Sequence, residues 1–134
     1  MDQQAIDTAV KRAREVMDGF AAAFNAEDAD AMRSRWFNFP HVRFHSGRVT
    51  IMERPEDFRS TVWERAGEAK GWARTAWDYV ELVDAEPDKV HFRVQFTRYR
   101  EDGSSMGSYK SFYIVTFQNG LWGIQGRSSW ADAG

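Results

Sequence analysis

Two kinds of hydrophobic pattern divide the chain into a helical first part and a strand-rich second part. In the first part, apolar residues recur at alternating spacings of four and three, which predicts one amphipathic helix over residues 3–25. The residues of this apolar stripe are Ile6, Val10, Ala13, Met17, Phe20 and Phe24. Asp28 is a good N-cap for a second, short helix that ends near Pro40. Pro55 opens a third helix that runs to about Ala66.

The second part is rich in β-branched and aromatic residues, a composition typical of strands. Strands are expected over residues 41–45, 48–52, 73–84, 90–100, 108–117 and 121–125. Asn119 and Gly120 tolerate the positive φ of a tight turn, so the last two strands form a hairpin. Helices followed by a run of strands predict an α+β domain with the helices on one face of the sheet.

Both faces of the strand over residues 108–117 are partly apolar. Tyr113 lies on one face, and Phe112 and Ile114 lie on the other. The chain's own helices are expected to cover the first face, and a second copy of the chain the other, which predicts a homodimer. An internal apolar pocket is expected on the covered face, bounded by Phe20, Phe24, Phe44, Val94 and Tyr113.

Composition narrows the class of protein. With 134 residues, the chain is long enough for one domain, expected over residues 1–134. The net charge of −2, without any basic block, gives no footprint for nucleic acid. The absence of cysteine excludes disulfides and thiolate chemistry. The N-terminus lacks a signal-peptide pattern and no apolar run could span a membrane, so a soluble cytoplasmic protein without membrane contact is expected.

Four short strings resemble one known superfamily. They are residues 20–28 (FAAAFNAED), 39–44 (FPHVRF), 55–58 (PEDF) and 120–125 (GLWGIQ). Together with the order of elements, they are similar to the nuclear transport factor 2-like superfamily, in its SnoaL-like and ketosteroid isomerase-like branches. The resemblance implies a cystatin-like α+β barrel: a conical, curved antiparallel sheet closed by about three N-terminal helices around an apolar pocket. It also implies dimerisation through the convex face of the sheet.

The resemblance also implies where catalytic groups would lie. In ketosteroid isomerase-like enzymes, a carboxylate on the first strand removes a proton, and a Tyr and a protonated Asp stabilise the oxyanion. Gapless pairing with that pattern brings Phe44 to the position of the base, Phe20 to that of the Tyr and Tyr113 to that of the Asp. The base and one donor are therefore missing, but Tyr113 could still polarise a substrate carbonyl.

Two histidines near the vacant base position are candidates for proton transfer. A bulge or a one-residue slip would turn His45 into the pocket, where an imidazole can act as general base. Without that slip His45 faces away, as a surface or structural histidine. His41 has the same two interpretations. Strand residues four apart are separated by ~13 Å, so His41 and His45 cannot share one metal ion, and no metal is expected.

Asp78 is the third candidate for catalysis. Strict alternation gives it the same face as Val80 and Leu82, where an apolar environment would raise the pKa of the carboxyl. The alternative is an exposed charge that pairs with Arg74 or Arg93.

The candidate ligand-binding residues are aromatic or lie near the expected pocket. They are Phe20, Phe24, Phe44, Val94, His41, Trp63 and Trp77. Arg93, Arg98 and Arg127 lie on strands, where a guanidinium could clamp a carboxylate ligand or pair with acidic residues across strands. No phosphate-binding loop, nucleophile elbow or zinc helix is present, so no cofactor is expected.

Three functions remain open at this point. The first is a cofactor-independent isomerase, cyclase or lyase (dehydratase) acting on an apolar carbonyl-bearing or aromatic, polyketide-like molecule. In it, Tyr113 polarises the carbonyl and His45 moves the proton. The second is a non-catalytic pocket for an apolar ligand, and the third is a protein-interaction module of the same fold. Fold resemblance alone does not choose among them.

Overall fold

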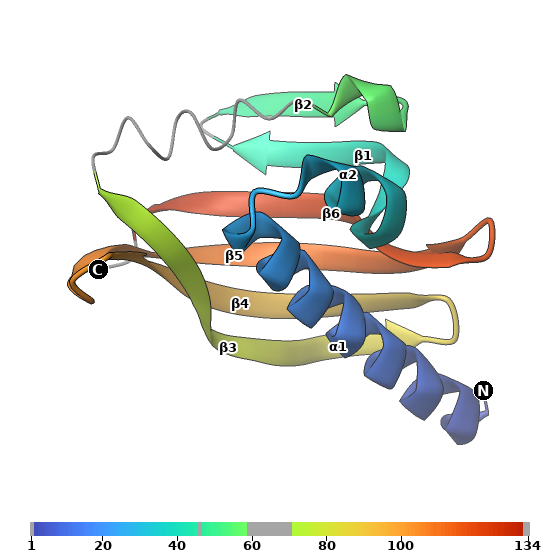
Figure 1. Ribbon diagram of the computed structural model, residues 1–134. Helices are drawn as coiled ribbons and strands as arrows, with labels where there is room; N and C mark the ends of the chain where they lie inside the picture. Colours follow the sequence, from blue (N-terminus) through green and yellow to red (C-terminus); the bar gives the residue numbers. More distant parts are fainter. Residues whose placement is uncertain (1, 46, 59–70, 133–134) are drawn as a thin grey trace.

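The computed structural model describes residues 2–45, 47–58 and 71–132, with side chains up to residue 130. In these residues, helices cover one face of a curved, six-stranded sheet, which is the predicted α+β architecture (Figure 1). The elements in chain order are α1 (Gln3–Asn25), α2 (Ala29–Ala31), η1 (Met32–Trp36), β1 (Phe37–His45), β2 (Arg48–Met52), η2 (Pro55–Asp57), β3 (Trp72–Glu86), β4 (Lys89–Arg100), β5 (Ser105–Gln118) and β6 (Leu121–Asp132).

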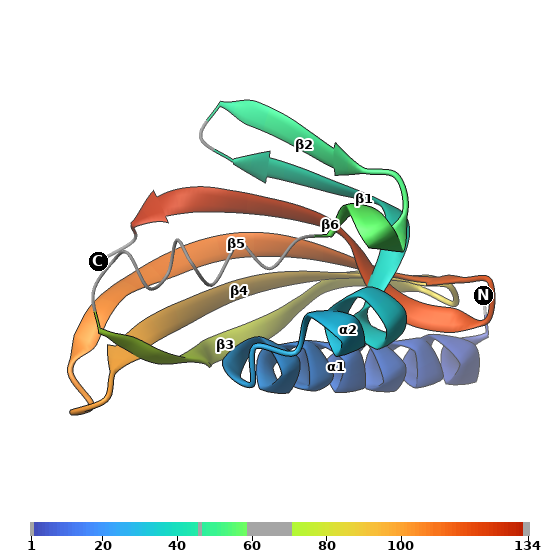
Figure 2. The same ribbon diagram turned by 45° about the horizontal axis from the view of Figure 1, so that its top comes forward.

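The strands lie in the order β2-β1-β6-β5-β4-β3. Neighbouring strands are antiparallel except β1 and β6, which run parallel. The expectation of an entirely antiparallel sheet is wrong at this pair, because β6 enters the sheet beside β1 instead of at a free edge. Pairing between β3 and β4 shifts register at three places, and such bulges increase twist and bending. The sheet therefore curves toward α1 (Figure 2).

Helix α1 forms where the apolar stripe predicts it. Its N-terminus is capped by Asp2, whose carboxylate accepts a hydrogen bond from the amide of Gln4 at 3.0 Å. The buried residues of the helix are Ala9, Ala13, Val16, Met17, Phe20 and Ala23. They share one core with Phe92 and Val94 of β4 and Val115 of β5, which are completely buried. Burial of this stripe, more than intrinsic propensity, stabilises the helix.

The second and third helices differ from the prediction. Asp28 does cap the second, since its carboxylate accepts a hydrogen bond from the amide of Ala31 at 3.0 Å. That helix is only the short α2, followed by the π-helix η1, and the strand begins earlier than expected, at Phe37. Of the third helix, only the 3₁₀ turn η2 lies among the described residues; residues 59–70 lie outside them. The described part of the chain therefore has two α-helices, not about three.

The hairpin of β5 and β6 agrees with the prediction. Asn119 and Gly120 adopt φ values of +53° and +79°, so the turn uses the left-handed conformations that these residue types tolerate. Along β5, Ser111, Tyr113 and Val115 are buried on the side of α1; the residues between them are only half-buried.

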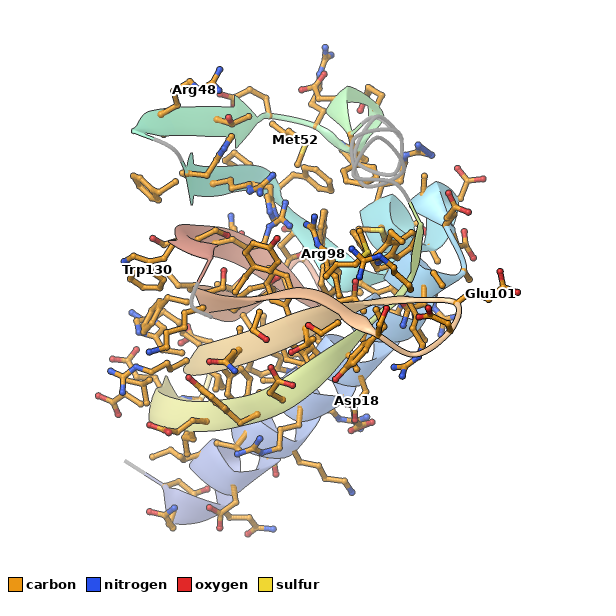
Figure 3. All side chains as sticks on the ribbon, turned by 90° about the vertical axis from the view of Figure 1, so that its left-hand side faces the viewer. Asp18, Arg48, Met52, Arg98, Glu101 and Trp130 are labelled. Atoms are coloured by element: carbon orange, nitrogen blue, oxygen red, sulfur yellow. The ribbon has the colours of Figure 1, made fainter. Side chains whose placement is uncertain are left out.

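The two faces of the sheet differ in what covers them. Figure 3 shows Arg98 on the face toward the helices and Trp130 on the opposite face, where Trp130 is 56% exposed. None of the described helices is both long and apolar enough to cross a membrane.

Candidate functional site

A pocket opens between the second half of α1 and the concave face of the sheet. It contains about 580 Å³ of empty space, counting its open mouth. The described residues that line it are Phe20, Ala21, Phe24, Arg43, Thr75, Trp77, Phe96, Arg98, Tyr113, Arg127 and Ser129. They come from α1 and from five strands, so only the folded sheet brings them together.

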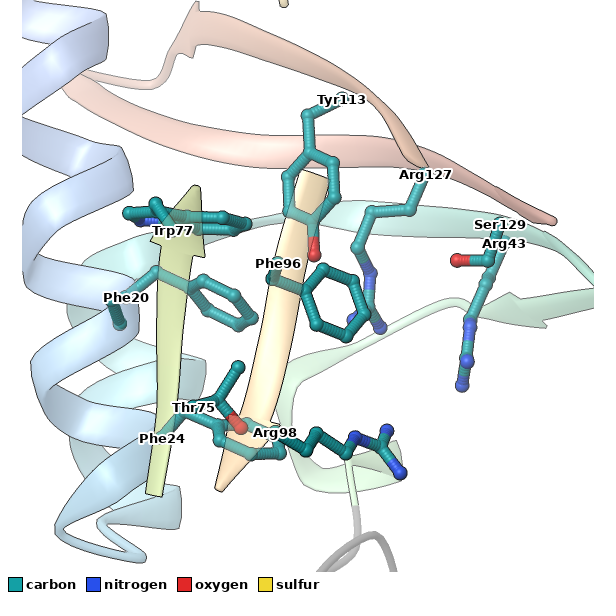
Figure 4. A pocket seen from close by; sticks show the side chains of 11 residues that line it. Phe20, Phe24, Arg43, Thr75, Trp77, Phe96, Arg98, Tyr113, Arg127 and Ser129 are labelled. Atoms are coloured by element: carbon teal, nitrogen blue, oxygen red, sulfur yellow. The ribbon is translucent and has the colours of Figure 1, made fainter. Parts of the chain in front are cut away.

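Aromatic rings form the wall of the pocket on the side of α1 (Figure 4). The ring of Phe20 lies with its centroid 6.2 Å from that of Trp77 and 5.9 Å from that of Tyr113. Trp77 also contacts Phe96 at 6.1 Å, and its indole N–H donates a hydrogen bond to the carbonyl of Met17 at 3.3 Å. These contacts fix the rings before any ligand arrives, which lowers the entropy that binding costs.

Three arginines lie across the pocket from this aromatic wall. Arg43 comes from β1, Arg98 from β4 and Arg127 from β6, and their guanidinium groups surround one space in Figure 4. Among the described lining residues there is no Asp, Glu or His. The pocket therefore combines an apolar wall with a positively charged one.

Arg127 is held in place by His41, which lies behind the pocket wall. The guanidinium Nε of Arg127 donates to Nε2 of His41 at 3.0 Å, so the histidine proton is on Nδ1, which donates to the carbonyl of Ile124 at 2.9 Å. The imidazole is completely buried and stacks on Phe37 with centroids 4.2 Å apart. The hydroxyl of Tyr113 raises the pKa of the Arg127 guanidinium. Neutral groups thus orient this cation.

The protonation states follow from the same contacts. Burial lowers the pKa of His41 to about 3, with a further contribution from the charges of Arg127 and Arg43. His41 is therefore neutral near pH 7 and able to accept the hydrogen bond. Burial also lowers the pKa of Arg127, which the hydroxyl of Tyr113 opposes. An arginine starts so high that it stays charged.

Arg98 is held by aromatic stacking. Its guanidinium carbon lies 5.1 Å from the ring centroid of Tyr109 and 5.9 Å from that of Phe96. Its Nε is buried and has no hydrogen-bond acceptor among the described residues. No described carboxylate forms an ion pair with Arg98 or Arg127.

The predicted acid–base residues lie outside the pocket. His45 is near the end of β1, where its Nε2 lies 3.1 Å from the hydroxyl of Thr50, and it is not among the lining residues. Asp78 is exposed; its carboxylate accepts hydrogen bonds from the hydroxyl of Thr97 at 2.6 Å and the amide of Gln95 at 3.0 Å. The register shift between Trp77 and Tyr79 breaks the alternation on which the inward position of Asp78 depended.

The predicted ligand-binding residues divide into two groups. Those that line the pocket are Phe20, Phe24, Trp77 and Tyr113. Phe44 does not, because strand alternation turns Arg43 inward and leaves Phe44 51% exposed on the other face. Val94 is in the core and His41 is behind Arg127, so neither reaches the pocket surface. Trp63 lies outside the described residues.

The arginines were only partly anticipated. Arg98 and Arg127 do face the pocket, but Arg93 lies outside it, with its guanidinium 3.5 Å from the carboxylate of Glu81. Arg43 was missed, although its alternation with Phe44 contained the signal. No group of three or more metal-ligating side chains occurs among the described residues.

The fold and its pocket define a class before any comparison is made: a curved α+β sheet that holds a small cavity against one long helix. A family model described as "NTF2-like protein (DUF6841)" matches residues 10–129, and the chain belongs to this family. A search of curated proteins found no match.

Solved structures agree on the fold. An NTF2-like protein with a cystatin-like fold from Novosphingobium aromaticivorans superposes with a TM-score of 0.70 at 14% identity, over 91% of this chain and 80% of that one. A ketosteroid isomerase-like protein from Erwinia carotovora gives 0.66 at 16% identity, over 92% and 95%. A protein of unknown function with a cystatin-like fold from Nostoc punctiforme gives 0.67 at 16% identity, over 88% and 86%. At these identities the likeness extends to the fold alone.

Proposed function

We propose that this protein binds a small molecule whose apolar, ring-bearing body rests against the aromatic wall of the pocket. The observation that carries the proposal is the preformed wall of Phe20, Trp77 and Phe96 beside an open pocket. Pockets with mostly apolar walls and a few convergent polar groups are typical of small-molecule sites.

Binding without general-base catalysis fits the lining best. Removal of a proton needs a base within about 3 Å of the substrate, or one water away. His45 hydrogen-bonds to Thr50, and Asp78 to Gln95 and Thr97. The described lining contains no carboxylate or imidazole. The binding function therefore needs nothing beyond the residues of the pocket.

A cofactor-independent isomerase, cyclase or dehydratase is the second candidate. One observation favours it: the hydroxyl of Tyr113 lies beside the guanidinium of Arg127 in the pocket, where the pair could polarise a substrate carbonyl. Loss of one such donor typically lowers turnover by ~10²–10³. Product formation that falls by such a factor in Tyr113→Phe, and that also falls in His45→Ala, would favour this enzyme over the binding protein.

The binding function can be tested with a panel of ring-bearing ketones, lactones and acids. A compound present at about a hundred times its Kd should stabilise the fold by ~2.7 kcal/mol and raise the melting temperature. Ala21 lines the pocket, whereas its neighbour Ala22 is exposed and does not. Ala21→Trp should therefore abolish the stabilisation, and the matched control Ala22→Trp should keep it. A ligand that stabilises both variants equally would bind elsewhere and would contradict the proposal.

A further inference from the structure

We infer that the ligand is a monocarboxylate with a hydrophobic ring system, whose carboxylate is bound by Arg98 and Arg127. The inference rests on the proposed binding function and adds the chemical class of the ligand. It is carried by the charge, the orientation and the surroundings of these two side chains.

The first argument is uncompensated charge. Arg127 contacts neutral groups, the imidazole of His41 at 3.0 Å and the ring of Phe37 at 5.1 Å, and no described carboxylate pairs with it. Arg98 contacts the rings of Phe96 and Tyr109, and its buried Nε has no described acceptor. A guanidinium removed from water without a counter-charge is costly, so an anion that enters the pocket gains from both cations at once.

The second argument is orientation. His41 uses the Nε–H of Arg127, and the end of the guanidinium lies in the pocket lining, as Figure 4 shows. Because His41 is buried, stacked on Phe37 and bonded to the carbonyl of Ile124, Arg127 is held before the ligand binds. A planar guanidinium with two free parallel N–H groups matches the two oxygens of a carboxylate.

The third argument is polarity across the pocket. The arginines come from the sheet side, whereas Phe20 and Phe24 come from the second half of α1 (Figure 4). A helix C-terminus carries a partial negative charge, which disfavours an anion on that side. A ligand with one charged end and one apolar end therefore has a single favoured orientation, with its carboxylate toward β4 and β6 and its rings toward α1.

The inference is tested with pairs of acids and their primary amides that share the same body. Suitable probes are phenylacetate and phenylacetamide, 2-naphthoate and 2-naphthamide, and cyclohexanecarboxylate and cyclohexanecarboxamide. Titration calorimetry should show the acid of at least one pair binding about 10- to 100-fold tighter than its amide, since a hydrogen bond to a charged group is worth ~1.5–3 kcal/mol. Equal binding of acid and amide would overturn the inference and leave the proposed function intact. If no member of any pair binds, the inference fails, and the ketones and lactones of the wider panel decide the proposed function.

Variants locate the anion site. Arg98→Met and Arg127→Met should each remove most of the preference for acid over amide while the amide still binds. Arg93→Met is the matched control, because Arg93 is on the same strand as Arg98 but is exposed and lies 3.5 Å from Glu81. Arg93→Met removes one positive charge, as the other two variants do, but should keep the preference for acid over amide. If Arg127→Met does not fold, the result for Arg98→Met alone tests whether the arginines bind the carboxylate. An unchanged preference in Arg98→Met, or an equal loss in Arg93→Met, would contradict the inference.

Discussion

His41 is the residue whose environment has the clearest consequence in solution. The imidazole is buried with a pKa of about 3, whereas a histidine in an unfolded chain has a pKa near 6.5. Between these values the unfolded chain binds a proton that the folded chain excludes. The contribution of His41 to stability is thus complete above about pH 6.5 and is lost as the pH falls toward 3.

The free energy of unfolding should therefore decrease on acidification by up to about 1.4 kcal/mol per pH unit from this residue alone. Urea unfolding at pH 7, 6 and 5 would measure it, with His41→Gln as the comparison, because Gln does not titrate. The difference in free energy of unfolding between the wild type and the variant should shrink as the pH falls. His91, whose pKa burial also lowers, is present in both proteins and cancels. Parallel curves for the two proteins would show that His41 is not held neutral.

Residue by residue, the sequence predicts most of the aromatic wall and only part of the charged one, since Arg98 and Arg127 were candidates and Arg43 was not. Phe20, Phe24 and Trp77 lie where helical periodicity and strand composition suggest. On β1 the prediction takes the apolar side for the inner side, and Phe44 and Arg43 exchange places as a result. Strand faces are usually assigned by assuming that apolar residues point inward and charged residues outward. Here Phe44 points outward and Arg43 points into the pocket, so hydrophobicity assigns the two faces the wrong way round.

At the level of elements, the packing of η1 on α1 depends on one glycine. Gly19 is in the middle of α1, where glycine costs ~1 kcal/mol relative to alanine. A Cβ at this position would lie 2.3–2.5 Å from ring atoms of Trp36, the last residue of η1. The glycine thus allows the indole to contact the helix backbone directly, which offsets its low helix propensity.

Gly19→Ala should accordingly lower the melting temperature, despite the better helix propensity of alanine. The same change in a Trp36→Ala background should instead raise stability by up to ~1 kcal/mol, because the clash is gone and only the propensity remains. Thermal unfolding of the four proteins in this double-mutant cycle would measure the coupling. Additive effects would mean that Trp36 moves aside at little cost, and would contradict direct packing of the indole on the helix.

Elements with strong local signals were predicted, and those that depend on distant contacts were not. The bounds of α1 and the turn at Asn119 follow from periodicity and from residue type. The π-helix η1 and the parallel pairing of β1 with β6 have no such local signal. Their conformation is determined by tertiary packing, such as that of Trp36 on Gly19, which a linear pattern does not contain.

For the whole molecule, the convex face of the sheet is the feature that the described part of the chain leaves without cover. An apolar groove on this face runs over β1, β5 and β6 and is lined by Val42, Phe44, Phe112 and Ile114, among others. Phe44 is 51% exposed there. Burial of such a side chain contributes ~1.5–3 kcal/mol. Two copies that pack groove against groove would therefore be stabilised by the burial of each of these apolar side chains.

We therefore predict a homodimer in which the two convex faces meet. Light scattering at micromolar concentration should give twice the 15.5 kDa mass of the chain. Phe44→Glu should shift the mass toward the monomer, since it brings two charges into a symmetric interface. Val83→Glu is the control: Val83 is also exposed, at 43%, but lies on β3, outside the groove, and the dimer should survive this change. A monomeric wild type would refute the dimer, and dissociation by Val83→Glu but not by Phe44→Glu would move the interface to the β3 edge of the sheet.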